Sequence, residues 1–153
     1  MHALLDRLLP RVVDNVFPGR AVALYAFYGL TAVTMWRSLH HLIAPDGGAQ
    51  SIATIPLDRY PGPASATIVS MFAFWGLSQL IVGLVYVVAA LRYRALIPLL
   101  LLLAIVEYVA RMAIPLFKPF ETAGTAPGAM MNLPMVVVLV ILLAASLTPG
   151  KSP

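Results

Sequence analysis

Four long apolar stretches constrain the fold more than any other feature of this chain of 153 residues. They cover residues 20–43, 64–91, 95–117 and 129–147. Each is close to the roughly 20 residues that a helix needs to cross about 30 Å of membrane hydrocarbon. Charged residues make up only 10% of the chain, too few to cover a soluble domain. The sequence therefore predicts an all-α polytopic membrane protein, a four-transmembrane-helix bundle that forms a single membrane domain over residues 1–153.

Proline and glycine mark the ends of these stretches. Residues 45–48 (Pro-Asp-Gly-Gly) follow the first stretch, and residues 61–63 (Pro-Gly-Pro) precede the second. Such combinations favour turns over helix. Residues 92–94 (Arg-Tyr-Arg) form a very short link between the second and third stretches, which predicts that those two helices are antiparallel neighbours. Residues 118–128 form the last loop.

The basic residues predict the orientation in the membrane. The positive-inside rule assigns the more basic flanks to the cytoplasm. The chain start, the 92–94 link and the chain end are basic, whereas the other two loops have no basic excess. We therefore expect a bacterial-type inner (plasma) membrane protein with both termini cytoplasmic. The basic flanking residues are Arg7, Arg11, Arg20, Arg92, Arg94 and Lys151.

Residues 1–17 have a different pattern. Two series of apolar residues recur every fourth position, starting at Leu4 and Leu5, and charged residues fall largely between them. This pattern predicts an N-terminal interfacial amphipathic helix, bent or interrupted near Pro10. A cleaved signal peptide is disfavoured because no long uncharged core precedes a small-residue cleavage site.

Composition excludes several classes of function. The chain has no cysteine, so disulfides, thiolate metal sites and cysteine nucleophiles are ruled out. The formal net charge of +4 is concentrated at helix ends rather than in a basic stripe with aromatics, so nucleic-acid binding is not expected. His40 and His41 are adjacent and point about 100° apart on a helix, so they are poor candidates for one metal or haem site.

Polar residues inside the stretches fall at two shared depths. Arg37, Trp75 and Arg111 each lie 17 residues from a flanking arginine (37 − 20, 92 − 75 and 111 − 94), or about 25 Å along a helix. Gln79 and Glu107 each lie 13 residues away (92 − 79 and 107 − 94), or about 20 Å. The sequence therefore predicts a polar layer in the outer half of the membrane.

Two further residues belong to this predicted layer. His40 lies one turn above Arg37, and Asn132 begins the fourth stretch at a similar height.

Glu107 and Arg111 form an i,i+4 pair in the favourable order. A charge inside the membrane costs at least about 2.5–3.5 kcal/mol, so such residues usually pair within the bundle.

Three interpretations of the layer stay open. Glu107 and Arg111 neutralise each other and only fix helix packing, or the residues line an outward-open pocket with excess positive charge, or they form a proton or ion path. Arg37 also has the alternative of extending to the outer head groups. For the pocket, the expected ligand-binding residues are Arg37, His40, Trp75, Gln79, Arg111 and Asn132.

Two segments carry a resemblance to a known family. Residues 76–84 (Gly-Leu-Ser-Gln-Leu-Ile-Val-Gly-Leu), followed by residues 91–95 (Leu-Arg-Tyr-Arg-Ala), resemble DoxX-like small four-helix integral membrane proteins. Chain length and the long, Pro/Gly-rich first loop agree with this resemblance. Gln79 departs from it, because an acidic residue is more typical there. The resemblance implies a four-helix bundle and raises quinone as a ligand by analogy alone.

The leading functional hypothesis is that the pocket binds a lipid-like, quinone-like or other amphiphile with an anionic or carbonyl head. The alternatives are a small membrane enzyme with Glu107 as catalytic acid or base, an oligomeric transporter or channel, and a structural subunit of a membrane complex. The expected partners are the lipid bilayer, an amphiphilic small molecule, and a second copy of the chain or a membrane-complex partner. No nucleophile with a base and an orienting group is visible in the sequence, which weakens the enzyme hypothesis.

Overall fold

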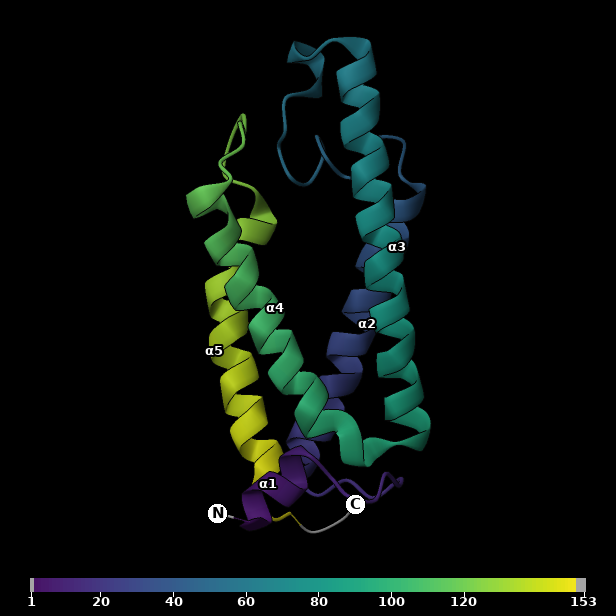
Figure 1. Ribbon diagram of the computed structural model, residues 1–153, viewed down its shortest axis with the longest axis vertical. Coiled ribbons are helices and arrows are strands. Elements are labelled where there is room, and N and C mark those ends of the chain that lie inside the picture. Colours follow the sequence, from purple (N-terminus) through teal and green to yellow (C-terminus); the bar gives the residue numbers. More distant parts are fainter. Residues whose placement is uncertain (1, 151–153) are drawn as a thin grey trace.

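The computed structural model describes residues 2–150, which contain α-helices and short 3₁₀ helices and no strand (Figure 1). The sequence-based prediction of an all-helical chain is confirmed for these residues. In chain order the elements are α1 (His2–Leu8), α2 (Ala21–Ile43), η1 (Leu57–Arg59), α3 (Gly62–Arg92), η2 (Arg94–Leu96), α4 (Ile97–Phe117) and α5 (Pro127–Leu147).

Proline sets the start of three of the long helices. Pro63, Pro98 and Pro127 each occupy one of the first two positions of α3, α4 and α5. The first amide groups of a helix have no partner within it, so proline loses no hydrogen bond there and supplies the right φ. Local sequence therefore determines where these helices begin.

Three of the helices are long and apolar enough to cross a membrane. They are α3, α4 together with η2, and α5. The helix α5 exposes apolar side chains over most of its surface, because only Leu139 and Ser146 are buried along its length. The helix α2 has 23 residues, about 34 Å, but it is not among these three. The structure is thus that of a helical membrane protein with three evident candidate spans.

The long helices form two pairs. The helix α2 packs along α3, and α4 packs along α5. The pairs converge at the end where η2 connects α3 to α4, and they separate toward the opposite end (Figure 1). The hydrophobic core lies in the converged half, where Phe27, Tyr86, Leu101 and Leu139 are almost fully buried. Side-chain packing therefore holds the two pairs together mainly at one end.

Glycine allows the close approach of α2 and α3. A Cβ atom on Gly76 would lie 2.8 Å from the Cβ of His41 and 3.0 Å from the backbone nitrogen of Leu42. A Cβ atom on Gly83 would lie 2.7 Å from the sulfur of Met35. Both glycines face α2, so the two helices can approach more closely there than larger residues would permit.

The N-terminal helix is shorter than expected. A helix over residues 1–17 was predicted, with a break near Pro10, but α1 ends at Leu8 and no helix resumes before Ala21. Pro10 cannot donate a backbone hydrogen bond, and it disfavours helical geometry at Leu9. Residues 9–20 instead run across the end of the bundle, where the amide of Arg20 donates to the carbonyl of Ala145 (3.1 Å).

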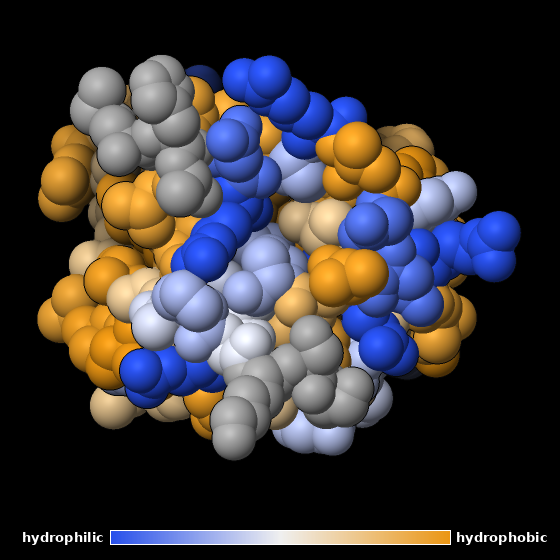
Figure 2. Space-filling model, turned by 90° about the horizontal axis from the view of Figure 1, so that it is seen from below, coloured by the Kyte–Doolittle hydropathy of each residue, from blue (hydrophilic) through white to orange (hydrophobic). Residues whose placement is uncertain are grey.

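The two ends of the molecule differ in charge and structure. The basic end comprises α1, residues 9–20, the α3–α4 turn and the end of α5; the loop end comprises residues 44–61 and 118–126. Hydrophilic side chains spread across the basic end, with hydrophobic side chains around them (Figure 2). Arg7 donates there to the backbone carbonyl of Leu147 (2.6 Å). The basic end thus carries charged side chains, and one of them, Arg7, holds α1 against the end of α5.

The two segments of the loop end contact each other. The Thr54 hydroxyl donates to the carbonyl of Gly124 (2.8 Å), and the amide of Ala123 donates to the carbonyl of Thr54 (2.7 Å). Arg59 also pairs with Glu121 (3.2 Å). These contacts connect the separated ends of the two helix pairs.

Candidate functional site

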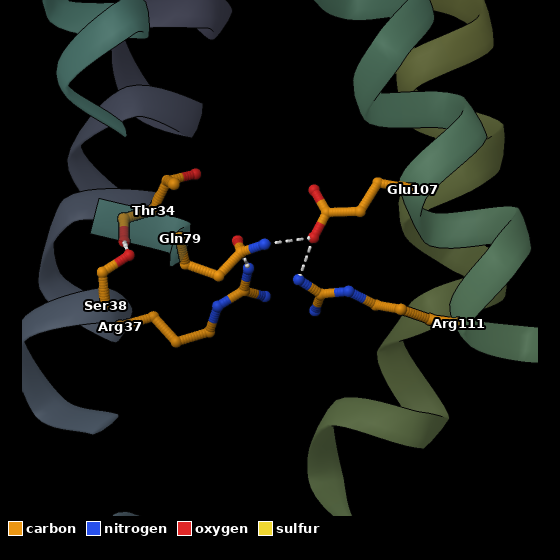
Figure 3. A network of polar contacts seen from close by, with 6 residues as sticks. All are labelled: Thr34, Arg37, Ser38, Gln79, Glu107 and Arg111. Atoms are coloured by element: carbon orange, nitrogen blue, oxygen red, sulfur yellow. Dashed lines mark hydrogen bonds and ion pairs between the residues drawn. The ribbon is translucent and has the colours of Figure 1, made fainter. Parts of the chain in front are cut away.

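Four side chains form a hydrogen-bonded chain from one helix pair to the other (Figure 3). Arg37 of α2 donates to the Gln79 side-chain oxygen (3.0 Å), and the Gln79 side-chain nitrogen donates to Glu107 Oε1 (2.7 Å). Arg111 pairs with the same Glu107 oxygen. We call Arg37, Gln79, Glu107 and Arg111 the polar network. It joins α2 and α3 to α4 above the converged core.

Trp75 lies against both arginines of the polar network. The guanidinium carbons of Arg37 and Arg111 are 5.9 and 5.1 Å from the centre of its ring. Tyr108 contacts Arg111 in the same way, at 5.2 Å. Aromatic faces attract cations, and the attraction grows where water is excluded. These rings therefore hold the two guanidinium groups within one small region.

The charges of the polar network do not balance. Arginine stays protonated in proteins, so two positive charges face the single carboxylate of Glu107. Arg111 contacts that carboxylate directly, whereas the hydrogen bond of Arg37 within the network goes to the neutral amide of Gln79. Within residues 2–150, Arg37 Nε is buried and has no hydrogen-bond partner. The network thus carries one excess positive charge, centred on Arg37.

An apolar groove adjoins the polar network between α3 and α4. Its volume is about 320 Å³. Gln79 and Glu107 line one end, and the other lining residues follow α3 and α4 toward the basic end: Val82, Val85, Tyr86, Leu100 and Leu103. The groove lies on the side of the polar network that faces the α3–α4 turn. The outward-open pocket expected from the sequence stays a prediction.

His40 and His41 have different surroundings, as their adjacency implies. His41 is buried and lies against Trp75 with the two rings tilted (4.6 Å between ring centres), and its Nδ1 lies 2.7 Å from the carbonyl oxygen of Gly47. A carbonyl only accepts, so Nδ1 carries the proton. His40 lies beside Trp36, and within the described chain its Nε2 is buried and unpartnered. Neither histidine takes part in the hydrogen bonds of the polar network.

Two other polar positions stay outside the polar network. The sequence placed Asn132 in the polar layer, but within residues 2–150 its side chain makes none of the hydrogen bonds of the polar network. Ser38 is buried near Arg37, but its hydroxyl donates to the carbonyl of Thr34 in its own helix (2.6 Å). Serine and threonine hydroxyls in helices often donate a hydrogen bond to a backbone carbonyl of the preceding turn in this way.

Sequence reasoning missed two tyrosines. Tyr108 was not singled out, although it precedes Arg111 by three residues and therefore lies on the same helix face. Tyr86 was not predicted as a site residue either, yet it is 4% exposed, packs on Phe27 (5.2 Å between ring centres) and lines the groove. Helical spacing could have identified the first, but burial of the second required the fold.

Comparison with protein families, with characterised proteins and with solved structures finds no match to this chain. The resemblance to DoxX-like proteins therefore stays a prediction. Within residues 2–150 no three acidic or histidine side chains gather in a way that would hold a metal ion. The candidate site therefore consists of the polar network and the groove beside it.

Proposed function

We propose that this protein binds an amphiphile inside the membrane, with the polar head of the ligand against Arg37. The observation that carries this proposal is the unpaired charge of Arg37, whose Nε is buried without a partner. Arg37 donates a hydrogen bond to Gln79, which lines one end of the apolar groove. A buried donor without an acceptor costs about 1–3 kcal/mol, more when it is charged. An oxygen atom of a ligand would remove that cost.

A purely structural network is the main alternative. It has support, because the polar network connects the two helix pairs where they separate. Packing explains Glu107 and Arg111, which form a neutral pair. It does not explain a second arginine, since an added cation in the membrane costs at least about 2.5–3.5 kcal/mol. An anionic head matches that excess charge better than the neutral carbonyl of a quinone.

A full bundle of four spans is part of the proposal. The helix α2 is long enough to span, and it runs along α3, which is one of the evident candidate spans. The side chain of Arg37 turns toward Gln79 rather than toward lipid. With α2 as a span, the basic end would face the cytoplasm and hold both termini. Such an arrangement agrees with an inner membrane protein of the DoxX-like type.

The decisive experiment replaces Arg37 with glutamine. This change removes the excess charge and leaves one amide carbonyl without its donor, a loss of about 1 kcal/mol. We expect Arg37→Gln to match or exceed the melting temperature of the wild type. Native mass spectrometry should show that the co-purified amphiphile is lost. Arg37→Lys keeps the charge but not the planar fork, so it should retain part of the ligand.

The structural alternative makes the opposite prediction for the same variants. If Arg37 only holds helices together, Arg37→Gln should melt at a lower temperature and carry the same small molecules as the wild type. That pair of results would overturn the proposal.

A further inference from the structure

We infer that the ligand is a single-chain anionic amphiphile, of the fatty-acid class, whose alkyl chain occupies the groove between α3 and α4. This inference rests on the proposed function and adds the ligand class, its orientation and its route of entry. It follows from the shape of the groove, from the openings in its wall and from the position of the unpaired cation.

The size of the groove fits one alkyl chain. Its volume of about 320 Å³ lies at the lower end of the range for ligand cavities. From Gln79 to Tyr86 the lining of α3 extends over seven residues, about 10 Å along the helix. From Glu107 back to Leu100 the lining of α4 covers the same length. An apolar groove of this volume and length can hold one alkyl chain alongside two facing helices.

The wall of the groove is open to the side. Val82, Val85 and Leu103 line it and are 36%, 49% and 51% exposed. These side chains belong to helices that are fit to span a membrane, so the space beside them is the lipid interior. An alkyl chain can therefore enter sideways from the bilayer without crossing water.

The polar end of the groove determines how the ligand lies. Glu107 lines that end, but its Oε1 already accepts from Gln79 and pairs with Arg111. The cation left over is Arg37, one hydrogen bond away through Gln79. A carboxylate against Arg37 would be held as a charge-assisted pair beside Trp75. The head then points toward the loop end and the chain toward the basic end.

This orientation matches that of lipids in the leaflet at the loop end. Their head groups lie at that surface, and their chains point toward the middle of the membrane. A single-chain anionic amphiphile from this leaflet would therefore enter without turning over. A lipid of the opposite leaflet would have to reverse, carrying its charged head through the hydrocarbon.

The test uses Trp75 as a reporter of the head position. The chain has two tryptophans, and the other, Trp36, is 66% exposed. The variant Trp36→Phe therefore leaves Trp75 as the only source of tryptophan fluorescence. It is placed in phosphatidylcholine vesicles and titrated with two brominated fatty acids, because bromine quenches tryptophan only at short range. One acid carries bromine beside the carboxylate, and the other carries it at the chain end.

We expect the acid labelled beside the carboxylate to quench Trp75 strongly and the acid labelled at the chain end to quench it weakly. Equal quenching, or stronger quenching from the chain end, would overturn the proposed orientation. A brominated phosphatidylglycerol that binds more tightly than either acid would overturn the single-chain class.

A matched pair of valine variants tests the groove itself. Val85 and Val88 lie on the same helix and are 49% and 51% exposed, but only Val85 lines the groove. In the Trp36→Phe background, Val85→Phe should weaken binding of the first acid about tenfold, which corresponds to about 1.4 kcal/mol. The Val88→Phe variant in the same background should bind this acid as tightly as the Trp36→Phe protein does.

The failures of the two proposals are distinguishable. If Val85→Phe leaves binding unchanged while Arg37→Gln abolishes it, the head site stands and the groove does not hold the chain. If Arg37→Gln leaves binding unchanged, the proposed function itself fails.

Discussion

Asp46 organises the start of the long loop that follows α2. Its carboxylate accepts hydrogen bonds from the backbone amides of Gly48 (2.8 Å), Gln50 (3.1 Å) and Ser51 (2.7 Å). Partial burial raises the pKa of Asp46, but the donors at Ser51, Gly48 and Gln50 outweigh it and lower the pKa from 3.8 to about 2. One side chain therefore satisfies three amides of a tight turn.

This arrangement predicts a pH-dependent contribution to stability. A carboxylate with a depressed pKa stabilises the folded state fully above its unfolded pKa near 4 and loses that effect as the pH falls toward 2. We expect Asp46→Ala to lower the free energy of unfolding by about 1 kcal/mol at neutral pH and by much less at pH 2. Thermal melts at both pH values provide the measurement.

The control is Asp58→Ala, which removes an exposed acid from the same loop. It should show no comparable difference between the two pH values. An Asp46→Ala variant that is equally destabilised at neutral and acidic pH would show that the lost contacts do not depend on the charge.

The sequence identified the individual residues of the polar network but not those of the groove. Counting residues from the flanking arginines placed Gln79 and Glu107 at one depth and Arg37 about one turn away, because the rise of a helix is fixed. Nothing in the sequence distinguishes Val85 from Val88, since both are apolar residues of one helix. Which of them faces α4 depends on how the helix pairs cross, and local patterns do not contain that information.

Helices were predictable to within a few residues where proline or glycine defines their ends. The stretches at 20–43, 64–91, 95–117 and 129–147 correspond to α2, to α3, to η2 with α4, and to α5. The N-terminal helix was less accurate because its apolar periodicity continues past Pro10, whereas the helix stops at Leu8. There the backbone effect of proline outweighs the side-chain pattern.

The two glycines of α3 offer a matched test of helix contact. Alanine is favoured over glycine in a helix by about 1 kcal/mol. At position 76 the new methyl would meet the backbone of α2, which cannot move aside, whereas at position 83 it would meet the flexible end of Met35. We expect Gly76→Ala to lower stability by about 1–3 kcal/mol and Gly83→Ala to leave it unchanged or slightly higher. Thermal melts in detergent compare the two.

Equal stability of the two variants would contradict this account of the α2–α3 contact. It would mean that the helices can separate at Gly76 without losing packing elsewhere.

For the whole molecule, topology depends on whether α2 crosses the membrane. Four spans leave both termini on one side, whereas three spans leave them on opposite sides. We expect fluorescent proteins that mature only in the cytoplasm to be bright in bacteria when fused to either terminus. The same fusion placed in residues 118–126 should be dark. A bright signal from only one terminus would exclude four spans.

The separation of the two helix pairs is the feature least accessible from sequence. It depends on where large side chains meet, and the buried core ends well before the loop end. Hydropathy reports that a residue is apolar but not whether it faces a neighbouring helix or lipid. Only the assembled core shows that the two helix pairs diverge toward the loop end.

The same divergence leaves the two helix pairs close together at the basic end and apart at the loop end (Figure 1). Beyond the buried core, polar contacts such as the Gln79–Glu107 hydrogen bond (2.7 Å) and the Arg59–Glu121 ion pair (3.2 Å) connect them. Any motion of one pair relative to the other would therefore hinge about the converged core.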